Sequence, residues 1–199
     1  MTALIDYGVG NLYSVAKAVS FVGGDVKITS DAEDLKRAEK MILPGVGAFG
    51  DCMKNLEATG LIPTILEQIA AKKFLLGICV GLQILFEKSE ESPNVKGLGI
   101  FKGEVKKISA ENLKIPHMGW NAVNFGESKI FAGLKNNSYF YFVHSYHAAP
   151  LDKNLISATS DYGEKITAAV ESENIFATQF HPEKSGDVGL KVLKNFIEF

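Results

Sequence analysis

Arginine is nearly absent from this chain. Of its 21 lysine and arginine residues, only Arg37 is an arginine. The planar guanidinium is the usual side chain for two-pronged recognition of carboxylates and phosphates, so the chain alone is poorly equipped to hold a heavily phosphorylated substrate. Cysteine is also scarce, because Cys52 and Cys79 are the only two. With no export signal in view, we expect free thiols rather than a disulfide.

Long apolar runs and runs of one charge are missing as well. No stretch approaches the roughly 18 consecutive apolar residues that span a bilayer, and residues 1–10 lack the basic start of a secretory signal. We therefore expect a cytoplasmic protein with no membrane partner. A net charge of −2 gives no general attraction to nucleic acid, so we expect no such partner. The length of 199 residues predicts a single domain spanning 1–199.

The first half of the chain alternates short apolar runs with helical spacing. Apolar runs predict strands at residues 3–5, 26–28, 41–43 and 74–78. Helical spacing predicts one helix from residue 12 to the glycines at 23–24, and another over about 62–72. Strands that are apolar throughout are buried on both faces, as in a parallel sheet covered by helices. This indicates an α/β fold with a doubly wound, mostly parallel sheet.

The pattern changes near residue 97. Strand-like runs separated by glycine and asparagine follow at 99–108, 120–125, 139–147, 155–159, 166–170 and 175–180. They predict a mixed or antiparallel extension of the sheet. Amphipathic spacing predicts a closing helix over about 187–198, and the polar stretch at 89–94 predicts a long exposed loop.

The most informative segment is a buried strand that runs into a glycine-flanked cysteine. Cys79 lies between Gly77 and Gly81 ahead of an expected helix, which is the spacing of a nucleophile elbow. Glycines on both sides allow a sharp turn from which the central side chain projects. The free amides of a helix N-terminus favour a thiolate on Cys79, and the Val80 N–H is placed as an oxyanion donor. The alternative is a small apolar cysteine in a core turn.

A base for this thiol is predicted near the other end of the chain. Among the four histidines, only His181 has a carboxylate at a useful spacing, in His181-Pro182-Glu183. Pro182 biases His181 towards an extended conformation, so the two side chains can lie on one side. His181 is then the base and Glu183 orients it. The alternative is a surface turn, and the order Cys, His, Glu differs from that of α/β-hydrolases.

A second glycine-rich turn follows the strand at 41–43. The spacing of Gly45, Gly47 and Gly50 matches the dinucleotide-binding fingerprint. The acidic residue expected about 20 positions later should end a strand, whereas Glu67 lies in a helical stretch. The same turn can present backbone N–H groups to an oxyanion. We favour the oxyanion role, with a nucleotide site and a plain turn as alternatives.

The histidines at 144 and 147 could suggest a metal pair. No cysteine or carboxylate lies close in sequence to complete a ligand set, so we predict no metal, and we expect no cofactor. A strand edge that lines a pocket is the favoured interpretation, with one of the two histidines an ordinary core residue. The aromatic run at 139–142 is interpreted as sheet core.

Over nearly its whole length, the chain resembles the class I glutamine amidotransferases. The marks of this class are glycine-flanked Cys79 followed by Leu82-Gln83, the turn at 44–47, and His181-Pro182-Glu183. Further segments are similar to glutaminase subunits of the histidine pathway within that family. These are Asp6-Tyr-Gly-Val-Gly-Asn-Leu, Pro116-His-Met-Gly-Trp-Asn, Tyr141-Phe-Val-His-Ser-Tyr and Glu183-Lys-Ser-Gly.

The resemblance implies a flavodoxin-like fold and the hydrolysis of L-glutamine to glutamate and ammonia. Cys79 would attack the side-chain amide, and His181 would protonate the leaving ammonia and then activate water to cleave the thioester. The ammonia would cross to a separate (βα)8-barrel synthase subunit in a heterodimer. Low activity without that partner is also implied, with reorientation of the Gly45–Gly47 peptide as a hypothesis for its cause.

The resemblance also implies roles by matching position. The oxyanion would be stabilised by Val80, Gly45, Val46 and Gly47. The glutamine would be contacted by Gln83, Ser145 and Tyr146. The partner and the ammonia exit would be faced by Trp120, Asn121, Tyr141 and Lys184. One departure is Ile100-Phe-Lys-Gly, where the family usually has an apolar residue and Pro-Gly; this concerns loop shape rather than the reaction.

Three alternatives stay open at this point. A paralogous glutaminase subunit could feed a synthase that aminates or amidinates surface sugars. A stand-alone cysteine hydrolase or esterase could share the fold, although Gln83 and the partner-facing segments argue against it. An interaction module without catalysis could retain the elbow, although the intact set of Cys79, His181 and Glu183 argues against that.

Overall fold

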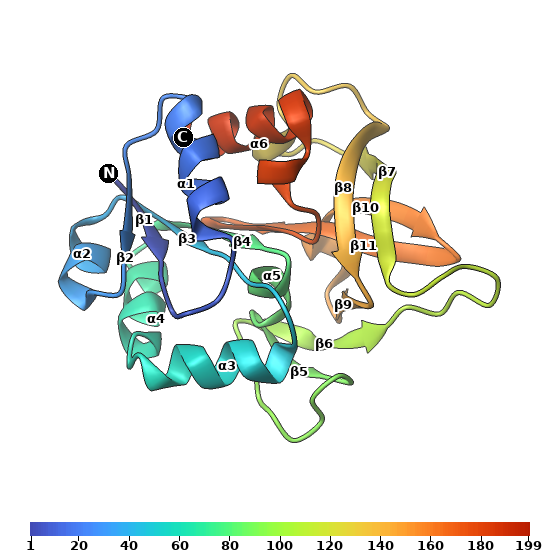
Figure 1. Cartoon of the computed structure of the whole chain (residues 1–199), viewed down its shortest axis with the longest axis horizontal. Helices are drawn as coiled ribbons and strands as arrows, with labels where there is room; N and C mark the ends of the chain where they lie inside the picture. The colour runs from blue at the N-terminus through green and yellow to red at the C-terminus, as the bar shows by residue number, and fades with distance from the viewer.

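The computed structural model describes residues 1–199 as two sheets, the larger with helices on both sides (Figure 1). The larger sheet has nine strands in the order β2-β1-β3-β4-β12-β11-β10-β7-β8, and the smaller has three in the order β5-β6-β9. The first five strands are β2 (Val26–Thr29), β1 (Thr2–Ile5), β3 (Lys40–Leu43), β4 (Phe74–Ile78) and β12 (Ile175–Thr178). The other four are β11 (Glu164–Ser172), β10 (Ile156–Tyr162), β7 (His117–Phe125) and β8 (Ser138–His144). The smaller sheet contains β5 (Phe86–Ser89), β6 (Phe101–Lys107) and β9 (Tyr146–Pro150).

The larger sheet divides into a parallel and an antiparallel half. Neighbouring strands are parallel from β2 to β12, and β1, β3 and β12 are buried along their whole length. From β12 through β11, β10 and β7 to β8, every pairing is antiparallel. The predicted doubly wound sheet with an antiparallel extension is therefore confirmed.

Helices cover both faces of the parallel half. α1 and α6 pack together on one face, and α3 and α4 lie on the opposite face (Figure 1). None of the helices has both the length and the apolar character needed to cross a bilayer. The helices are α1 (Leu12–Phe21), α2 (Ala32–Arg37), α3 (Phe49–Ala58), α4 (Ile62–Ala70), α5 (Val80–Gln83) and α6 (Gly186–Glu198).

The run at 139–147 and the stretch at 89–94 differ from the sequence-based predictions. The run at 139–147 is two strands rather than one, because the chain leaves the larger sheet after His144 and enters the smaller sheet at Tyr146. The predicted exposed loop at 89–94 is shorter, since Ser89 is a buried end of β5 and the Glu91 carboxylate accepts a hydrogen bond from the Phe49 N–H at 2.8 Å. Both differences depend on pairing with distant segments, which local pattern does not contain.

The closing helix holds the aromatic core of the parallel half, so a truncation there should be costly. Phe196 on α6 is fully buried, with its ring 6.2 Å from that of Phe176 on β12. We expect Phe196→Ala to lower the free energy of unfolding by about 3–5 kcal/mol through lost burial and the remaining cavity. Phe21→Ala is the matched control, since Phe21 is 79% exposed, and should change it by about 0.5 kcal/mol or less. Urea unfolding measures both; equal effects would contradict the packing described.

Candidate active site

The elbow is built from one strained residue and two close backbone approaches. Cys79 directly follows β4 and has φ of 56° and ψ of −111°, a conformation that L residues rarely adopt. A Cβ on Gly81 would lie 2.0 Å from the Leu43 carbonyl oxygen, and one on Gly77 would lie 2.9 Å from the Gly81 oxygen. The glycines therefore serve close packing against β3 and within the turn, while the unusual backbone angle lies on Cys79 itself.

The helix expected after the elbow is only one turn long. α5 ends at Gln83, and the chain soon becomes β5. A helix of four residues aligns few peptide dipoles, so the helix-dipole argument for a thiolate on Cys79 is weak. The charged group beside the sulfur is the imidazole of His181.

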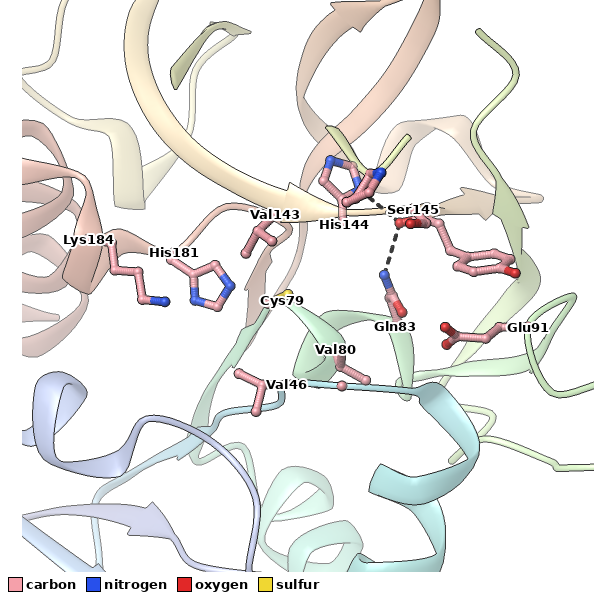
Figure 2. A pocket seen from close by; sticks show the side chains of 13 residues that line it. Val46, Cys79, Val80, Gln83, Glu91, Val143, His144, Ser145, His181 and Lys184 are labelled. Carbon is pink, nitrogen blue, oxygen red and sulfur yellow. Dashed lines mark hydrogen bonds between the residues drawn. The ribbon is translucent and has the colours of Figure 1, made fainter. Parts of the chain in front are cut away.

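His181 approaches the sulfur from the loop that follows β12. Its backbone N–H donates to the Tyr141 carbonyl at 3.0 Å, and its Nδ1 lies 2.9 Å from the Glu183 Oε1. Both side chains are buried, and neither His181 Nε2 nor Glu183 Oε2 has a hydrogen-bond partner. Figure 2 shows the His181 ring beside Cys79, and both residues line a cavity of about 370 Å³.

The electrostatics of His181 are set by two opposing effects. Burial lowers the pKa of His181, but the influence of the neighbouring Cys79 sulfur and Glu183 carboxylate outweighs burial and raises the pKa to about 10. The imidazole is therefore charged at neutral pH. Cys52, by contrast, lies away from any cation, and burial raises the pKa of its thiol to about 11. Both cysteines are free, as predicted.

The sulfur also contacts a residue that sequence analysis missed. Gln179 is fully buried, and its Nε2 lies 3.7 Å from the Cys79 sulfur. Its Oε1 accepts a hydrogen bond from Gln83 Nε2 at 3.1 Å. The available signal was its position two residues before His181 and near the end of an expected strand, where a buried polar side chain needs a partner.

The glycine-rich turn at 44–47 packs against the elbow, and three of its carbonyl oxygens accept hydrogen bonds. The Tyr7 hydroxyl donates to the Pro44 oxygen at 2.5 Å, and the Cys52 thiol donates to the Val46 oxygen at 3.3 Å. Between them, the Gly45 oxygen accepts from the Val80 N–H at 3.4 Å. The predicted oxyanion donor is thus turned towards a carbonyl, and it becomes available only when that carbonyl moves away.

The cavity brings together most of the predicted site residues. Gln83, Ser145 and Tyr146 line it together with Val46, Gly47, Val80 and Lys184. Ser145 and Tyr146 reach the cavity because the chain changes sheets between β8 and β9 at that point. The nucleotide interpretation of the turn finds no support in the fold, since Glu67 lies within α4 rather than at the end of a strand.

Two of the predicted partner-facing residues, Trp120 and Asn121, point to opposite sides of β7. Trp120 is 54% exposed and is paired across the strands with Tyr141, over whose ring the Lys184 Nζ lies at 5.9 Å. Asn121 points the other way, as the next residue in a strand must, and its amide donates to the Asp161 oxygen at 3.0 Å. The aromatic run at 139–142 is split in the same manner: its phenylalanines are core, as interpreted, whereas Tyr139 is 59% exposed.

Comparison with known proteins agrees with this geometry. The family described as "Glutamine amidotransferase class-I" matches residues 3–199. The chain is 49% identical over 202 residues to "Imidazole glycerol phosphate synthase subunit HisH 1" of Methanococcus maripaludis, covering 100% of this chain and 99% of the relative. It is 51% identical over 198 residues to "Imidazole glycerol phosphate synthase subunit HisH" of Methanothermobacter thermautotrophicus, covering 100% and 98%.

Solved structures share the fold at lower identity. One described as "Crystal structure of glutamine amidotransferase" superposes with a TM-score of 0.77 at 18% identity, covering 99% of each chain. "Structure of PurLQS from Thermotoga maritima" gives a TM-score of 0.77 at 20% identity, covering 99% of this chain and 97% of the other.

The charged imidazole predicts how the two cysteines react. We expect iodoacetamide at pH 8 to modify Cys79 and spare Cys52, and we expect His181→Gln to slow the modification about tenfold because it removes the cation that stabilises a thiolate. The pKa of His181 is raised, so its charge persists until the pH passes about 10. Above that value, the rates at which Cys79 is modified in the wild-type and His181→Gln proteins should converge. Mass spectrometry of digests measures both sites. Equal rates for the two proteins at pH 8 would contradict a role for the imidazole charge beside the sulfur.

Proposed function

The chain belongs to the class I glutamine amidotransferase family, and from that premise we propose that it is the glutaminase subunit of an imidazole glycerol phosphate synthase in histidine biosynthesis. The observation that supports this reaction is the placement of Cys79 beside a carboxylate-bound imidazole, His181, at the wall of one cavity (Figure 2). A nucleophile, a proton donor and an orienting carboxylate are what amide hydrolysis through a thioester requires.

Cys79 attacks the side-chain amide carbon of L-glutamine. The tetrahedral intermediate collapses when His181 gives its Nε2 proton to the departing ammonia, which leaves a glutamyl thioester on the sulfur. His181, now neutral, takes a proton from water as the water attacks the thioester, and glutamate is released. Glu183 keeps the imidazole in place by holding Nδ1, and it stabilises the charged form.

The oxyanion needs donors that the resting structure withholds. Rotating the peptide between Gly45 and Val46 would turn the carbonyl away from the Val80 N–H and bring the Val46 N–H towards the sulfur. The Tyr7 and Cys52 bonds hold the carbonyls on either side, so the rotation is confined to that one peptide. Two donors would then face the oxyanion, and a partner that favours the rotated form would switch the glutaminase on.

The ammonia is used on another chain. Ammonia that escapes into neutral water becomes protonated and cannot attack, so a closed passage to the second active site is favoured. Lys184 lines the cavity and covers the Tyr141 ring, and Trp120 lies next to Tyr141 on the outer face. We therefore assign this face to a (βα)8-barrel synthase subunit. That subunit would bind the phosphates of its substrate, since this chain has only one arginine with which to hold them.

The glutaminase chemistry is tested by substitution in the triad. In the presence of the synthase subunit, we expect Cys79→Ala to abolish glutamate release and Glu183→Gln to reduce kcat by about 100-fold or more. Cys52→Ser is the control, because serine keeps a donor for the Val46 carbonyl and should retain activity. Undiminished glutamate release by Cys79→Ala would contradict the proposal.

The partner face is tested separately by affinity. We expect Trp120→Ala and Tyr139→Ala each to raise the Kd for the synthase subunit about 10- to 100-fold, as aromatic anchors at interfaces do. Phe21→Ala removes an exposed ring from α1, away from this face, and should leave the Kd unchanged. Isothermal titration calorimetry measures all three. Unchanged affinity in both aromatic variants would exclude this face as the docking surface, and co-purification of a sugar-modifying synthase instead would favour the paralogous subunit.

A further inference from the structure

Two buried histidines take no part in the reaction described above. His117 on β7 and His144 on β8 are directly paired across the strands and are 2% and 6% exposed. The Nδ1 of His117 lies 2.9 Å from the Nε2 of His144. His144 also lines the active-site cavity, so the pair connects the buried side of β7 to that cavity.

The directions of the hydrogen bonds through this pair are fixed by the groups at either end, the Tyr146 carbonyl and the Asn121 amide. His144 Nδ1 lies 2.8 Å from the Tyr146 carbonyl oxygen, which can only accept, so Nδ1 carries the proton. In the neutral ring Nε2 is then an acceptor and receives the Nδ1 proton of His117. The Nε2 of His117 accepts in turn from the amide of Asn121 at 3.2 Å. This one arrangement of protons gives each ring nitrogen of His117 and His144 a hydrogen-bond partner.

The surroundings keep both rings neutral. The His117 ring is stacked between Phe142 and Tyr162, with centroids 4.8 and 4.0 Å away. Burial lowers the pKa of His144 to about 3 and that of His117 to about 4. No carboxylate pairs with either ring, and the neighbouring ionisable groups that act on His144 (His117, His147 and His181) oppose its protonation. A proton added to His144 Nε2 would face the N–H of His117.

The Tyr146 carbonyl passes this constraint on to the substrate pocket. It accepts a second hydrogen bond, from Gln83 Nε2 at 3.0 Å, and the other amide hydrogen of Gln83 goes to Gln179. Figure 2 shows His144 and Gln83 converging on the same carbonyl. Both amide hydrogens of Gln83 are thereby used, so its Oε1, which bonds to no other group of the chain, is the polar atom left for the cavity.

We propose that His144, oriented by His117, is a positioning residue that fixes the Tyr146 carbonyl and thereby turns the acceptor oxygen of Gln83 towards bound glutamine. This inference rests on the proposed glutaminase function, and it adds a route by which β7, the strand that carries Trp120, bears on substrate affinity. An acceptor at this point suits the ammonium or amide hydrogens of glutamine. The pair acts through binding, so it affects KM rather than the steps at sulfur.

The test compares two substitutions in the complex with the synthase subunit. His144→Asn keeps a donor where Nδ1 was, whereas His144→Leu removes it. We expect His144→Leu to raise the KM for glutamine about tenfold, the size expected for a misdirected hydrogen bond. The kcat, normalised to the fraction of chains in which Cys79 can be alkylated, should change less than about threefold. His144→Asn should keep KM within about threefold. Equal KM values for the two variants, or a fall in kcat with KM unchanged, would overturn the positioning role.

A second measurement needs no substitution and stands even if the leucine variant does not fold. Nitrogen NMR of the imidazoles in the intact chain should show both His117 and His144 neutral, with the proton on Nδ1, between pH 6 and 8. A proton on Nε2 of either ring, or a charged ring, would overturn the arrangement. Absence of glutaminase activity in the wild-type complex would count against the proposed function instead, so the two failures are distinguishable.

Discussion

The site depends on the parallel pairing of β12 with β4. These strands are about 100 residues apart in the chain, yet Thr178 lies beside Ile78, and the Cys79 N–H donates to the Thr178 carbonyl at 2.7 Å. In parallel strands the carboxyl ends emerge at the same edge of the sheet. Cys79, which follows β4, and His181, which follows β12, are therefore brought to one point by the backbone register.

The same edge explains why one cavity is lined by several separate segments of the chain. The turn after β3 arrives at it next to β4, and the break between β8 and β9 brings in Ser145 and Tyr146. Gln83 donates to both the Tyr146 carbonyl and Gln179, and the Gln179 amide lies 3.7 Å from the Cys79 sulfur. Both amide hydrogens of Gln83 are used in this network, which fixes the direction of its side chain.

The resting site is poised rather than complete. The sulfur and imidazole are already together, but the Val80 N–H is turned towards a carbonyl of the oxyanion turn. An enzyme whose product is consumed by another subunit benefits from this separation, because it avoids releasing ammonia when no acceptor is present. The exposed aromatic face on β7 and β8 lies next to Lys184, and Lys184 lines the same cavity as Val46 and Gly47 of the turn. We therefore propose that a partner bound at this face can influence the turn.

Much of this could be predicted from the sequence, and the limits have physical reasons. The elbow around Cys79, the His181 and Glu183 pair and the doubly wound sheet are local patterns, and local spacing is enough to identify them. The short α5, the change of sheet at Ser145, the inward Asn121 and the contact of Gln179 with sulfur all depend on which distant strand lies alongside. That register is set by tertiary packing, and side-chain direction follows from it.

The central claim is that Cys79 forms a covalent bond with the side-chain carbonyl carbon of glutamine at the edge shared by β4 and β12. A diazoketone analogue of glutamine, followed by intact-mass and peptide analysis, measures this most directly. The account predicts one adduct per chain, on Cys79, formed faster when the synthase subunit is bound. An adduct on Cys52, or no adduct at all in the complex, would contradict it.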